Sequence, residues 1–379
     1  MKILQFEYQD KSLGWHLKPV DFSKQNLSLL VGVSGVGKTL ILQAIINIKN
    51  IAKGKSFNGV KWDILFSAQN TLQYHWEGEF QFYQNIENSE KEFEIIFEKL
   101  TVNGKLLAER KDTAIHYDGI LITPKLSPFQ SIPELFRQEE KVRIAYEELS
   151  KIKSDAQAFG NPVVIPWDQL DSLKKQYADL ENIRKSDLLL WVKLILLYSN
   201  LPEQFKHISD HFKDIFPQVE EIKIGIQGDF SMLNTRMTEL PILMKERHVN
   251  TWIHQKHISA GMLKTLHHLC EMYLLPEGSV ILTDEFENSL GVNCIDSLTD
   301  ILFQEKRDLQ FVITSHHPYI INNISKKYWK IVTRKGSEVN VRDADEFPLG
   351  KTKHSAFIEL MQLEAYTEAF DGMTADTIL

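Results

Sequence analysis

The chain has 379 residues, of which 43% are apolar and 25% are charged, and its formal net charge is −8. This balance predicts a large globular core. It excludes the strongly basic surface that broad binding to nucleic acid or to a membrane requires. The sequence has two cysteines, residues 1–7 lack the apolar run of a signal peptide, and the most apolar stretch, 188–197, is too short to cross a bilayer. We therefore expect a cytoplasmic protein with reduced cysteines and no membrane partner.

The first third of the chain is predicted to contain short strands, one helix and an antiparallel sheet. Residues 1–31 are expected to form strands that end in an apolar run at 27–31. Apolar residues then recur at helical spacing through 40–50, which predicts a helix. From 58 to 122 the sequence alternates and is rich in aromatic residues, as antiparallel strands are, and Asn103-Gly104 predicts a hairpin turn.

The middle of the chain is predicted to be helical. Residues 131–158 carry apolar side chains seven apart, among them Leu135, Val142 and Leu149. Glycine and proline interrupt the pattern at 160–166, which we interpret as the tip of a helical hairpin. Amphipathic helices are expected to follow, so the region is either a packed helical lobe or a partner-binding arm. Beyond it, alternating strand-like and helix-like segments return.

A glycine-rich loop matches the phosphate-binding pattern G-x-x-x-x-G-K-[ST] in full, with an apolar strand before it and a helix after it. Its residues are Gly32, Val33, Ser34, Gly35, Val36, Gly37, Lys38 and Thr39. Glycines allow consecutive backbone N–H groups to surround a β-phosphate, and the start of the following helix presents its positive end to the anion. Lys38 is expected to reach the β- and γ-phosphates, and the Thr39 hydroxyl is expected to bind Mg²⁺. The loop therefore predicts that the chain binds, and hydrolyses, a nucleoside triphosphate.

A second apolar run, residues 280–283, ends in Asp284 and Glu285. In a P-loop protein such a strand ends beside the nucleotide. Asp284 would then hold Mg²⁺ through water, and Glu285 would polarise the attacking water. A core strand that simply enters an acidic turn is the alternative interpretation.

Two further segments carry residues suited to a γ-phosphate. An apolar strand over 311–315 is followed by His316 and His317, either of which could meet the phosphate and the attacking water. Earlier in the chain, Ser259 and Gly261 open a predicted helix, and a helix start is a ready anion site. An ordinary helix cap is the alternative there, because serine is a favoured capping residue.

These four motifs, in this order, resemble those of the ABC-type ATPases of the SMC, RecF, RecN and OLD group, including its AAA15/AAA21-like members. The similar segments are 32–39 (Walker A), 258–264 (a degenerate signature), 280–285 (Walker B) and His316 (the switch histidine). The proline two residues after His316 is similar to the group's usual text and favours His316 over His317. Residues 287–290, Glu-Asn-Ser-Leu, are similar to the text that follows Walker B in the group.

The resemblance implies an α/β fold: a P-loop NTPase of ABC type, with an antiparallel β subdomain and an inserted helical lobe or short coiled-coil hairpin. It also implies four segments. These are an N-terminal ATPase lobe (1–130), a helical insertion (131–217), a C-terminal ATPase lobe (218–335) and a C-terminal extension (336–379).

The resemblance further implies that ATP and Mg²⁺ bind at sites shared within a homodimer or higher homo-oligomer. Ser259 and Gly261 of one subunit would then act on the γ-phosphate held by the other. The group also has a glutamine that joins Mg²⁺ to the attacking water, for which Gln130 is our candidate and Gln69 a weaker rival. The signature reads Ile-Ser-Ala-Gly-Met, and Ser34 stands where the group often has asparagine. Neither departure removes a phosphate ligand, although the preferred nucleotide base is left open.

The length of the chain outside the ATPase motifs suggests which process such an ATPase serves. OLD nucleases carry a metal-binding Toprim domain, and the roughly 45 residues after position 333 leave no room for one. The chain resembles the compact ATPase subunits of bacterial anti-phage systems such as Septu and PARIS, whose partner is a separate effector, a nuclease or a toxin. The alternatives are a DNA repair or recombination ATPase of the RecF type, with DNA as partner, and a scaffold that binds ATP without turnover. The acidic net charge weighs against the first alternative, and Glu285 with His316 weighs against the second.

Overall fold

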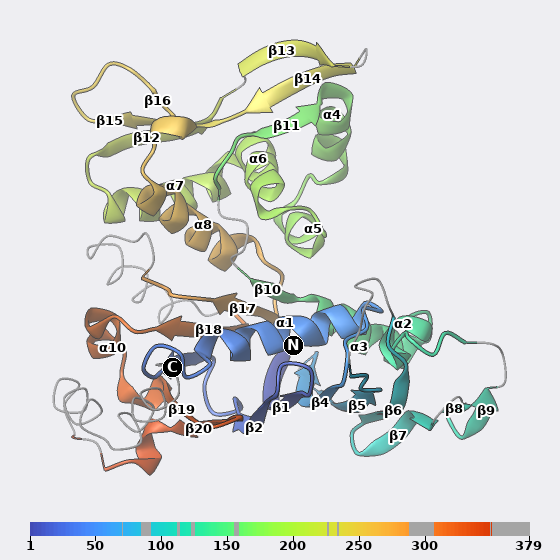
Figure 1. Ribbon diagram of the computed structural model, residues 1–379. Coiled ribbons are helices and arrows are strands. Elements are labelled where there is room, and N and C mark those ends of the chain that lie inside the picture. Colours follow the sequence, from blue (N-terminus) through green and yellow to red (C-terminus); the bar gives the residue numbers. More distant parts are fainter. Residues whose placement is uncertain are drawn as a thin grey trace. The chain divides into compact units, whose positions relative to one another are not determined.

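The computed structural model describes residues 1–69, 71–84, 92–111, 114–122, 126–154, 159–225, 227–232, 235–287, 307–348 and 350. The chain divides into two compact units (Figure 1). Unit 1 comprises 1–155, 277–286 and 308–379, and unit 2 comprises 156–276 and 287–307.

Unit 1 is built on one sheet of 14 strands, in the order β10-β17-β18-β3-β19-β20-β2-β1-β4-β5-β6-β7-β8-β9. The first five are parallel to one another. They are β10 (Ile152–Ser154), β17 (Ser279–Thr283), β18 (Leu309–Ser315), β3 (Leu27–Val31) and β19 (Trp329–Lys335). Every residue of β3, β17 and β18 is buried, as expected for parallel strands covered on both faces.

The rest of this sheet is mainly antiparallel. Its strands are β20 (Glu338–Asp343), β2 (Trp15–Asp21), β1 (Lys2–Asp10), β4 (Val60–Ala68), β5 (Leu72–Phe80), β6 (Ile95–Val102), β7 (Lys105–Lys111), β8 (Ala114–Tyr117) and β9 (Ile120–Ile122). Burial alternates along β4 and β5, because one face packs on the core and the other meets solvent. The antiparallel sheet expected over 58–122, with its turn at Asn103-Gly104, is therefore confirmed.

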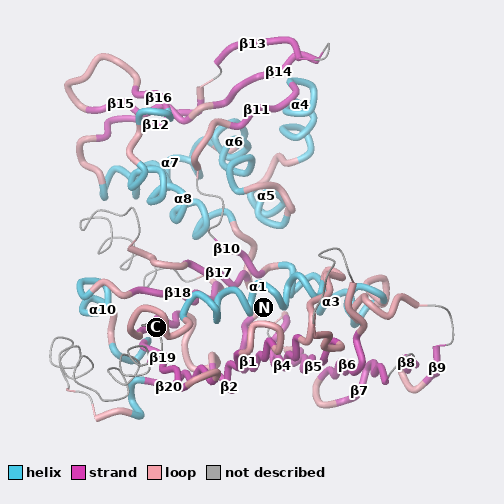
Figure 2. The backbone as a smooth tube through the Cα atoms, in the orientation of Figure 1, coloured by secondary structure: helices cyan, strands magenta, loops and turns pink. Residues whose placement is uncertain are grey.

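The helices of unit 1 pack on this sheet. They are α1 (Lys38–Ala52), α2 (Ile132–Leu135), α3 (Glu140–Ser150) and α10 (Pro318–Asn323), with short 3-10 turns η2 (Lys326–Tyr328) and η3 (Ala344–Glu346). Figure 2 shows α1 running along the sheet. Its Ile41, Ile45 and Ile48 are fully buried in the same core as Phe6 and Tyr8 of β1. This packing fixes the start of α1 against the parallel strands.

The prediction of continuous helix through 131–158 is wrong at its end. The chain leaves α3 at Ser150, and Ile152–Ser154 form β10, which pairs in parallel with β17. Ile152 is completely buried. The open edge of β17 offers backbone partners and a buried position for a β-branched side chain, and these outweigh the helical spacing.

Unit 2 combines a helical cluster with two three-stranded sheets. Its helices are α4 (Trp167–Gln176), α5 (Leu180–Lys185), α6 (Leu190–Asn200), α7 (Pro202–Ile215) and α8 (Ala260–Leu274), with the 3-10 turn η1 (Gln255–His257). One sheet contains β11 (Val163–Pro166), β14 (Thr235–Leu240) and β13 (Gln227–Met232). The other contains β12 (Val219–Ile224), β15 (Ile242–Glu246) and β16 (Ile253–His254).

Two features of unit 2 bear on the sequence predictions. The hairpin tip expected at 160–166 is wrong, because Val163–Pro166 pair with β14 as a strand. The apolar segment around Lys193 forms α6, which is buried nearly all round, and the Lys193 ammonium donates to the Arg184 carbonyl at 2.7 Å. Among the described residues, no helix is both long and apolar enough to span a membrane.

Candidate nucleotide-binding site

The glycine-rich loop connects the end of β3 to the start of α1. Gly35 and Gly37 have φ angles of 86° and 105°, a left-handed conformation that side chains disfavour. A Cβ atom on Gly32 would lie 2.7 Å from the carbonyl oxygen of Val332, so only glycine fits there. These positions explain why the loop needs its glycines, independently of any ligand.

The start of α1 has the charge properties of an anion site. Its first turn contains no acidic residue, so no carboxylate offsets the positive end of the helix. The Lys38 ammonium donates to the carbonyls of Gly32 and Val33 at 2.7 and 3.0 Å, which holds it against the loop itself. The Thr39 side chain is exposed. Cationic, amide and hydroxyl groups therefore gather at one place, as phosphate binding requires.

Asp284 lies next to the phosphate loop. The Thr39 hydroxyl donates to Asp284 Oδ2 at 2.8 Å, and the Thr314 hydroxyl donates to Oδ1 at 2.6 Å. Strands β3, β18 and β17 are parallel neighbours, so their carboxyl ends bring these residues together. A hydroxyl and a carboxylate oxygen suit Mg²⁺, and two adjacent ligands of an octahedral Mg²⁺ at about 2.1 Å lie roughly 3 Å apart. Thr39 and Asp284 therefore fit the ion in chemistry and in spacing.

Glu285 follows directly, with its side chain exposed and its backbone in a left-handed conformation at φ 45°. Its backbone N–H donates to the Thr314 hydroxyl at 2.8 Å. The next residue, Phe286, donates its N–H to the Thr314 carbonyl at 3.0 Å. The turn after β17 is thus bonded to β18, and a non-glycine residue in the left-handed region there is unusual enough to suggest a functional constraint.

The two adjacent histidines after β18 have different roles in the fold. His317 is the N-cap of α10, and its Nδ1 accepts from the Tyr319 N–H at 3.2 Å. His316 is exposed at the carboxyl end of β18. Because capping orients the His317 ring toward its own helix, His316 stays the candidate of the two for a ligand.

Ser259 and Gly261 belong to unit 2. Ser259 is the N-cap of α8, and its hydroxyl accepts from the Met262 N–H at 3.2 Å. Ser259 remains exposed. The capping interpretation and an anion-binding role are therefore compatible, because a capped helix start still presents backbone N–H groups. Of the Glu-Asn-Ser-Leu stretch, only Glu287 falls within the described residues.

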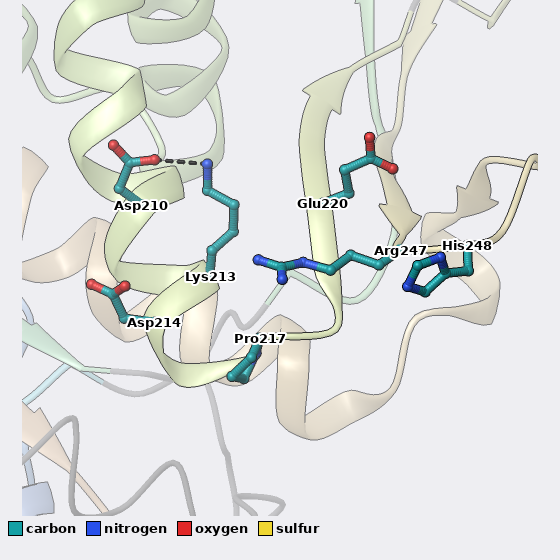
Figure 3. Close-up of a pocket in the computed structure, with 7 residues that line it drawn as sticks. All are labelled: Asp210, Lys213, Asp214, Pro217, Glu220, Arg247 and His248. Carbon is teal, nitrogen blue, oxygen red and sulfur yellow. Dashed lines mark ion pairs between the residues drawn. The ribbon is translucent and has the colours of Figure 1, made fainter.

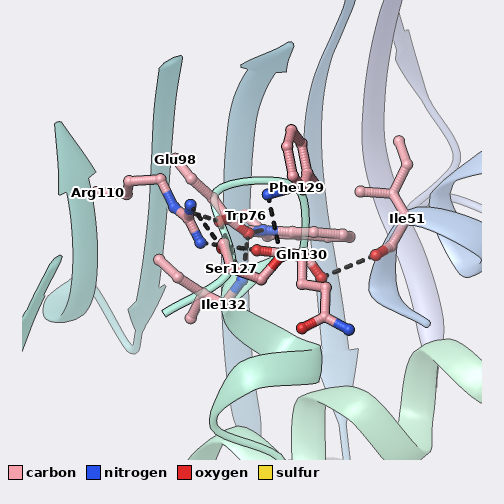
Figure 4. Close-up of polar contacts among 9 residues, drawn as sticks. Ile51, Trp76, Glu98, Arg110, Ser127, Phe129, Gln130 and Ile132 are labelled. Atoms are coloured by element: carbon pink, nitrogen blue, oxygen red, sulfur yellow. Dashed lines mark hydrogen bonds and ion pairs between the residues drawn. The ribbon is translucent and has the colours of Figure 1, made fainter. Parts of the chain in front are cut away.

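The structure does not bring Gln130 to the phosphate loop, which is a correction to the prediction. The Gln130 side chain lies beside Gly54, just past the carboxyl end of α1. Thr39 lies at the other end of this 15-residue helix, and at a rise of about 1.5 Å per residue the two ends are roughly 20 Å apart. Figure 4 shows Gln130 between Ile51 and the buried Glu98–Arg110 pair, with Arg110 donating to the Gln130 carbonyl at 2.7 Å.

The rival glutamine, Gln69, is also remote from the loop. It follows β4, whose last residues pair with the first residues of β1. The Met1 ammonium in turn donates to the carbonyl of Gly278, which precedes β17. Gln69 therefore lies near the amino ends of the parallel strands, whereas the phosphate loop lies at their carboxyl ends.

Strand β10 is the parallel neighbour of β17 on the side away from β18, and Ser154 is level with Leu282. The next residues, 155–158, lie outside the described residues.

Two other polar groupings in the described residues differ from this site. Figure 3 shows an open pocket in unit 2, whose lining mixes both charges and includes an ion pair of 2.7 Å between Lys213 and Asp210. The pocket is lined by Asp210, Lys213, Asp214, Pro217, Glu220, Arg247 and His248. On the sheet of unit 1, Asp63, His75 and Glu77 lie close enough to share a metal ion. Cross-strand ion pairs, such as His75 with Asp63 at 2.8 Å, account for that cluster.

Comparisons with known proteins bear on the family and the fold of the chain. The family described as "AAA domain, putative AbiEii toxin, Type IV TA system" matches residues 27–322, which include the phosphate loop, both acids and His316. No curated protein matches the chain.

Similar solved structures include an SMC head bound to the C-winged helix domain of ScpA, at 11% identity and a TM-score of 0.51, covering 90% of this chain and 97% of that one. They also include the SMC head domain from Thermotoga maritima, at 10% identity, 90% and 99% coverage, and a TM-score of 0.43. A third is an Smc head with an extended coiled coil bound to the C-terminal domain of ScpA, derived from Pyrococcus furiosus, at 13% identity, 90% and 96% coverage, and a TM-score of 0.45. The first of these likenesses supports the fold. The chain therefore belongs to this AAA domain family, and it has the α/β fold of the ABC-type ATPases of the SMC and RecF group.

Proposed function

We propose that the chain binds ATP with Mg²⁺ and hydrolyses it at the carboxyl ends of β3, β17 and β18. The observation that carries this proposal is the 2.8 Å contact between Thr39 of the phosphate loop and Asp284 of the acidic pair. It joins two motifs that lie 245 residues apart in the sequence. When bound, Mg²⁺ would neutralise charge on the β- and γ-phosphates, with Thr39 and Asp284 as its protein contacts.

The remaining residues have roles that follow from their positions. Lys38 and the loop amides bind the phosphates, because they supply the positive charge and the N–H donors at the start of α1. Glu285 orients the attacking water and accepts its proton, since its carboxylate is exposed beside Asp284. His316 contacts the γ-phosphate.

The ATP site is proposed to be completed by a second copy of the chain. The exposed start of α8, with Ser259 and Gly261, offers hydroxyl and N–H donors but belongs to a different unit from the phosphate loop. Donors of this kind stabilise charge on a phosphate that one subunit leaves exposed. Nucleotide binding would then close a homodimer or a higher homo-oligomer, and hydrolysis would open it.

The biological role that we propose is control of a separate effector, a nuclease or a toxin, in bacterial anti-phage defence. The family description names the AbiEii toxin and a type IV toxin–antitoxin system, which motivates a toxin–antitoxin setting for this chain. The net charge of −8 supports it too, since an acidic surface does not favour coating DNA. Contact with another protein has a parallel in the SMC head that was solved with a domain of ScpA.

Two experiments test these proposals separately. In the first, Glu285→Gln protein is mixed with ATP and Mg²⁺, and its mass is measured in solution. We expect a stable nucleotide-bound dimer, whereas Lys38→Ala protein stays unassembled; a Glu285→Gln protein that retains no nucleotide would refute the site. In the second, the chain is purified from its native operon with associated proteins. Recovery of a nuclease or toxin supports defence, and recovery of DNA-processing proteins would instead support the repair alternative.

A further inference from the structure

Thr314, the second-last residue of β18, forms hydrogen bonds with three consecutive residues of the acidic turn, Asp284, Glu285 and Phe286. It is completely buried and lies between β17 and β3, in the centre of the parallel strands. Neither the phosphate-loop pattern nor the acidic pair includes Thr314, which lies two residues before His316. Its contacts nevertheless lead directly to both acids.

The Thr314 hydroxyl uses its donor and one acceptor position at once. It donates to Asp284 Oδ1 at 2.6 Å and accepts from the Glu285 N–H at 2.8 Å. The second oxygen of Asp284 accepts from Thr39 at 2.8 Å. A continuous chain of hydrogen bonds therefore runs from the phosphate loop, through Asp284 and Thr314, to the backbone of Glu285.

The geometry at Glu285 makes the Thr314 hydroxyl more than an incidental partner. Glu285 has a φ of 45°, which non-glycine residues rarely adopt unless surrounding contacts impose it. The Thr314 hydroxyl binds the N–H of this residue, and the Thr314 carbonyl binds the N–H of Phe286. Only the first of these bonds depends on the side chain, so a variant without the hydroxyl still keeps a strand-to-turn bond.

We propose that Thr314 is the positioning residue that sets Asp284 and Glu285 relative to the phosphate loop. The inference rests on the proposed ATPase function and deepens it. Without the hydroxyl, Asp284 loses the partner that orients its carboxylate, and Glu285 loses the bond that fixes its left-handed turn. The Lys38 ammonium donates to the carbonyls of Gly32 and Val33 within the phosphate loop, so we expect nucleotide affinity to depend mainly on the loop.

The test compares Thr314→Val, which keeps the shape and removes the hydroxyl, with Thr314→Ser, which keeps the hydroxyl. We expect Thr314→Val to lower kcat by about 100-fold, because misplacing a catalytic group by about 1 Å has this effect. The KM for ATP should change less than about threefold, as the contacts that bind substrate are kept. The Mg²⁺ concentration that half-saturates binding of a fluorescent ATP analogue should rise several-fold. Thr314→Ser should restore both values.

Thr238→Val is a matched control, because Thr238 is also completely buried and lies on β14 of unit 2, outside every motif of the site. It should leave kcat within about twofold of wild type, since it forms no part of the proposed hydrogen-bond chain. If wild type hydrolyses ATP and Thr314→Val matches it in kcat and in Mg²⁺ requirement, the positioning role is wrong. Equal losses in Thr314→Val, Thr314→Ser and Thr238→Val would also overturn it, as they would indicate a general loss of stability.

The Mg²⁺ titration separates this inference from the proposed hydrolysis. If wild type binds the analogue without turnover, hydrolysis fails as a proposal. A higher Mg²⁺ requirement in Thr314→Val alone would then still support the positioning role, and an unchanged requirement would refute it.

Discussion

Replacement of Glu98 by alanine should strongly destabilise unit 1. Glu98 is completely buried on β6, and its carboxylate accepts from Trp76 Nε1 at 2.9 Å and from the Ile132 N–H at 2.8 and 2.9 Å. It also lies 3.7 Å from Arg110 Nε, and Arg110 is 2% exposed (Figure 4). The alanine variant leaves two N–H groups and a guanidinium buried without this partner. Breaking a buried pair of this kind costs about 3–5 kcal/mol.

The loss can be measured as a shift in the thermal unfolding of unit 1. For a unit of this size, 3–5 kcal/mol corresponds to a decrease in Tm of roughly 6–20 °C. Glu77→Ala is the matched control, because Glu77 pairs across strands with Lys99 at 3.6 Å on the exposed face of the same sheet. Removing this surface pair should cost about 1 kcal/mol or less. If Glu98→Ala lowers Tm no more than Glu77→Ala does, our account of the buried cluster is wrong.

Three further predictions address the composite site, the glutamine and acid stability. Mixing Lys38→Ala with Ser259→Ala protein should recover about a quarter of wild-type ATPase activity per site, by random pairing of subunits; folded proteins that recover none would exclude action between subunits. Gln130→Ala should leave kcat within about twofold of wild type, because Gln130 lies beyond the end of α1 that is remote from Thr39, and a loss of about 10-fold or more in a steady-state assay would contradict this placement. Burial alone would raise the pKa of Glu271, but the two histidines one turn earlier outweigh it and lower that pKa to about 2. The resulting stabilisation is present above the ordinary carboxyl pKa and is lost as the pH falls from about 4.5 to about 2. Over this range the Tm of wild type should therefore fall more steeply than the Tm of Glu271→Gln, by the equivalent of about 3 kcal/mol. Parallel curves of Tm against pH would contradict this role of Glu271.

The parallel half of the fold could be predicted because its sequence signals are local. The strands that end at the phosphate loop, at Asp284 and before His316 are mainly apolar runs followed by polar residues. Such runs are typical of strands buried on both faces. Once three such strands are assigned to one parallel sheet, their carboxyl ends must share an edge, and the Thr39–Asp284 contact follows.

Gln130 was misplaced because strand order is not a local property. Gln130 follows the strand-like text at 120–122, but that strand, β9, ends the antiparallel side of the sheet, whereas β17 lies on its parallel side. The strand that pairs with the outer edge of β17, Ile152–Ser154, has three residues and continues the apolar spacing of the helix before it. Its identity comes from the free edge of β17, which contributes backbone partners from more than 100 residues away. The same limit hid Thr314, whose importance arises from contacts across strands.

Release of phosphate from ATP by the purified chain, measured with and without Mg²⁺ in wild type and in Glu285→Gln, is the most direct test of the proposed site. We expect hydrolysis that requires Mg²⁺ in wild type. In Glu285→Gln it should fall by a factor of about 100 or more, with nucleotide binding retained. Hydrolysis at the wild-type rate in Glu285→Gln would show that the carboxylate beside Asp284 does not activate the water, and the proposed site would then be wrong.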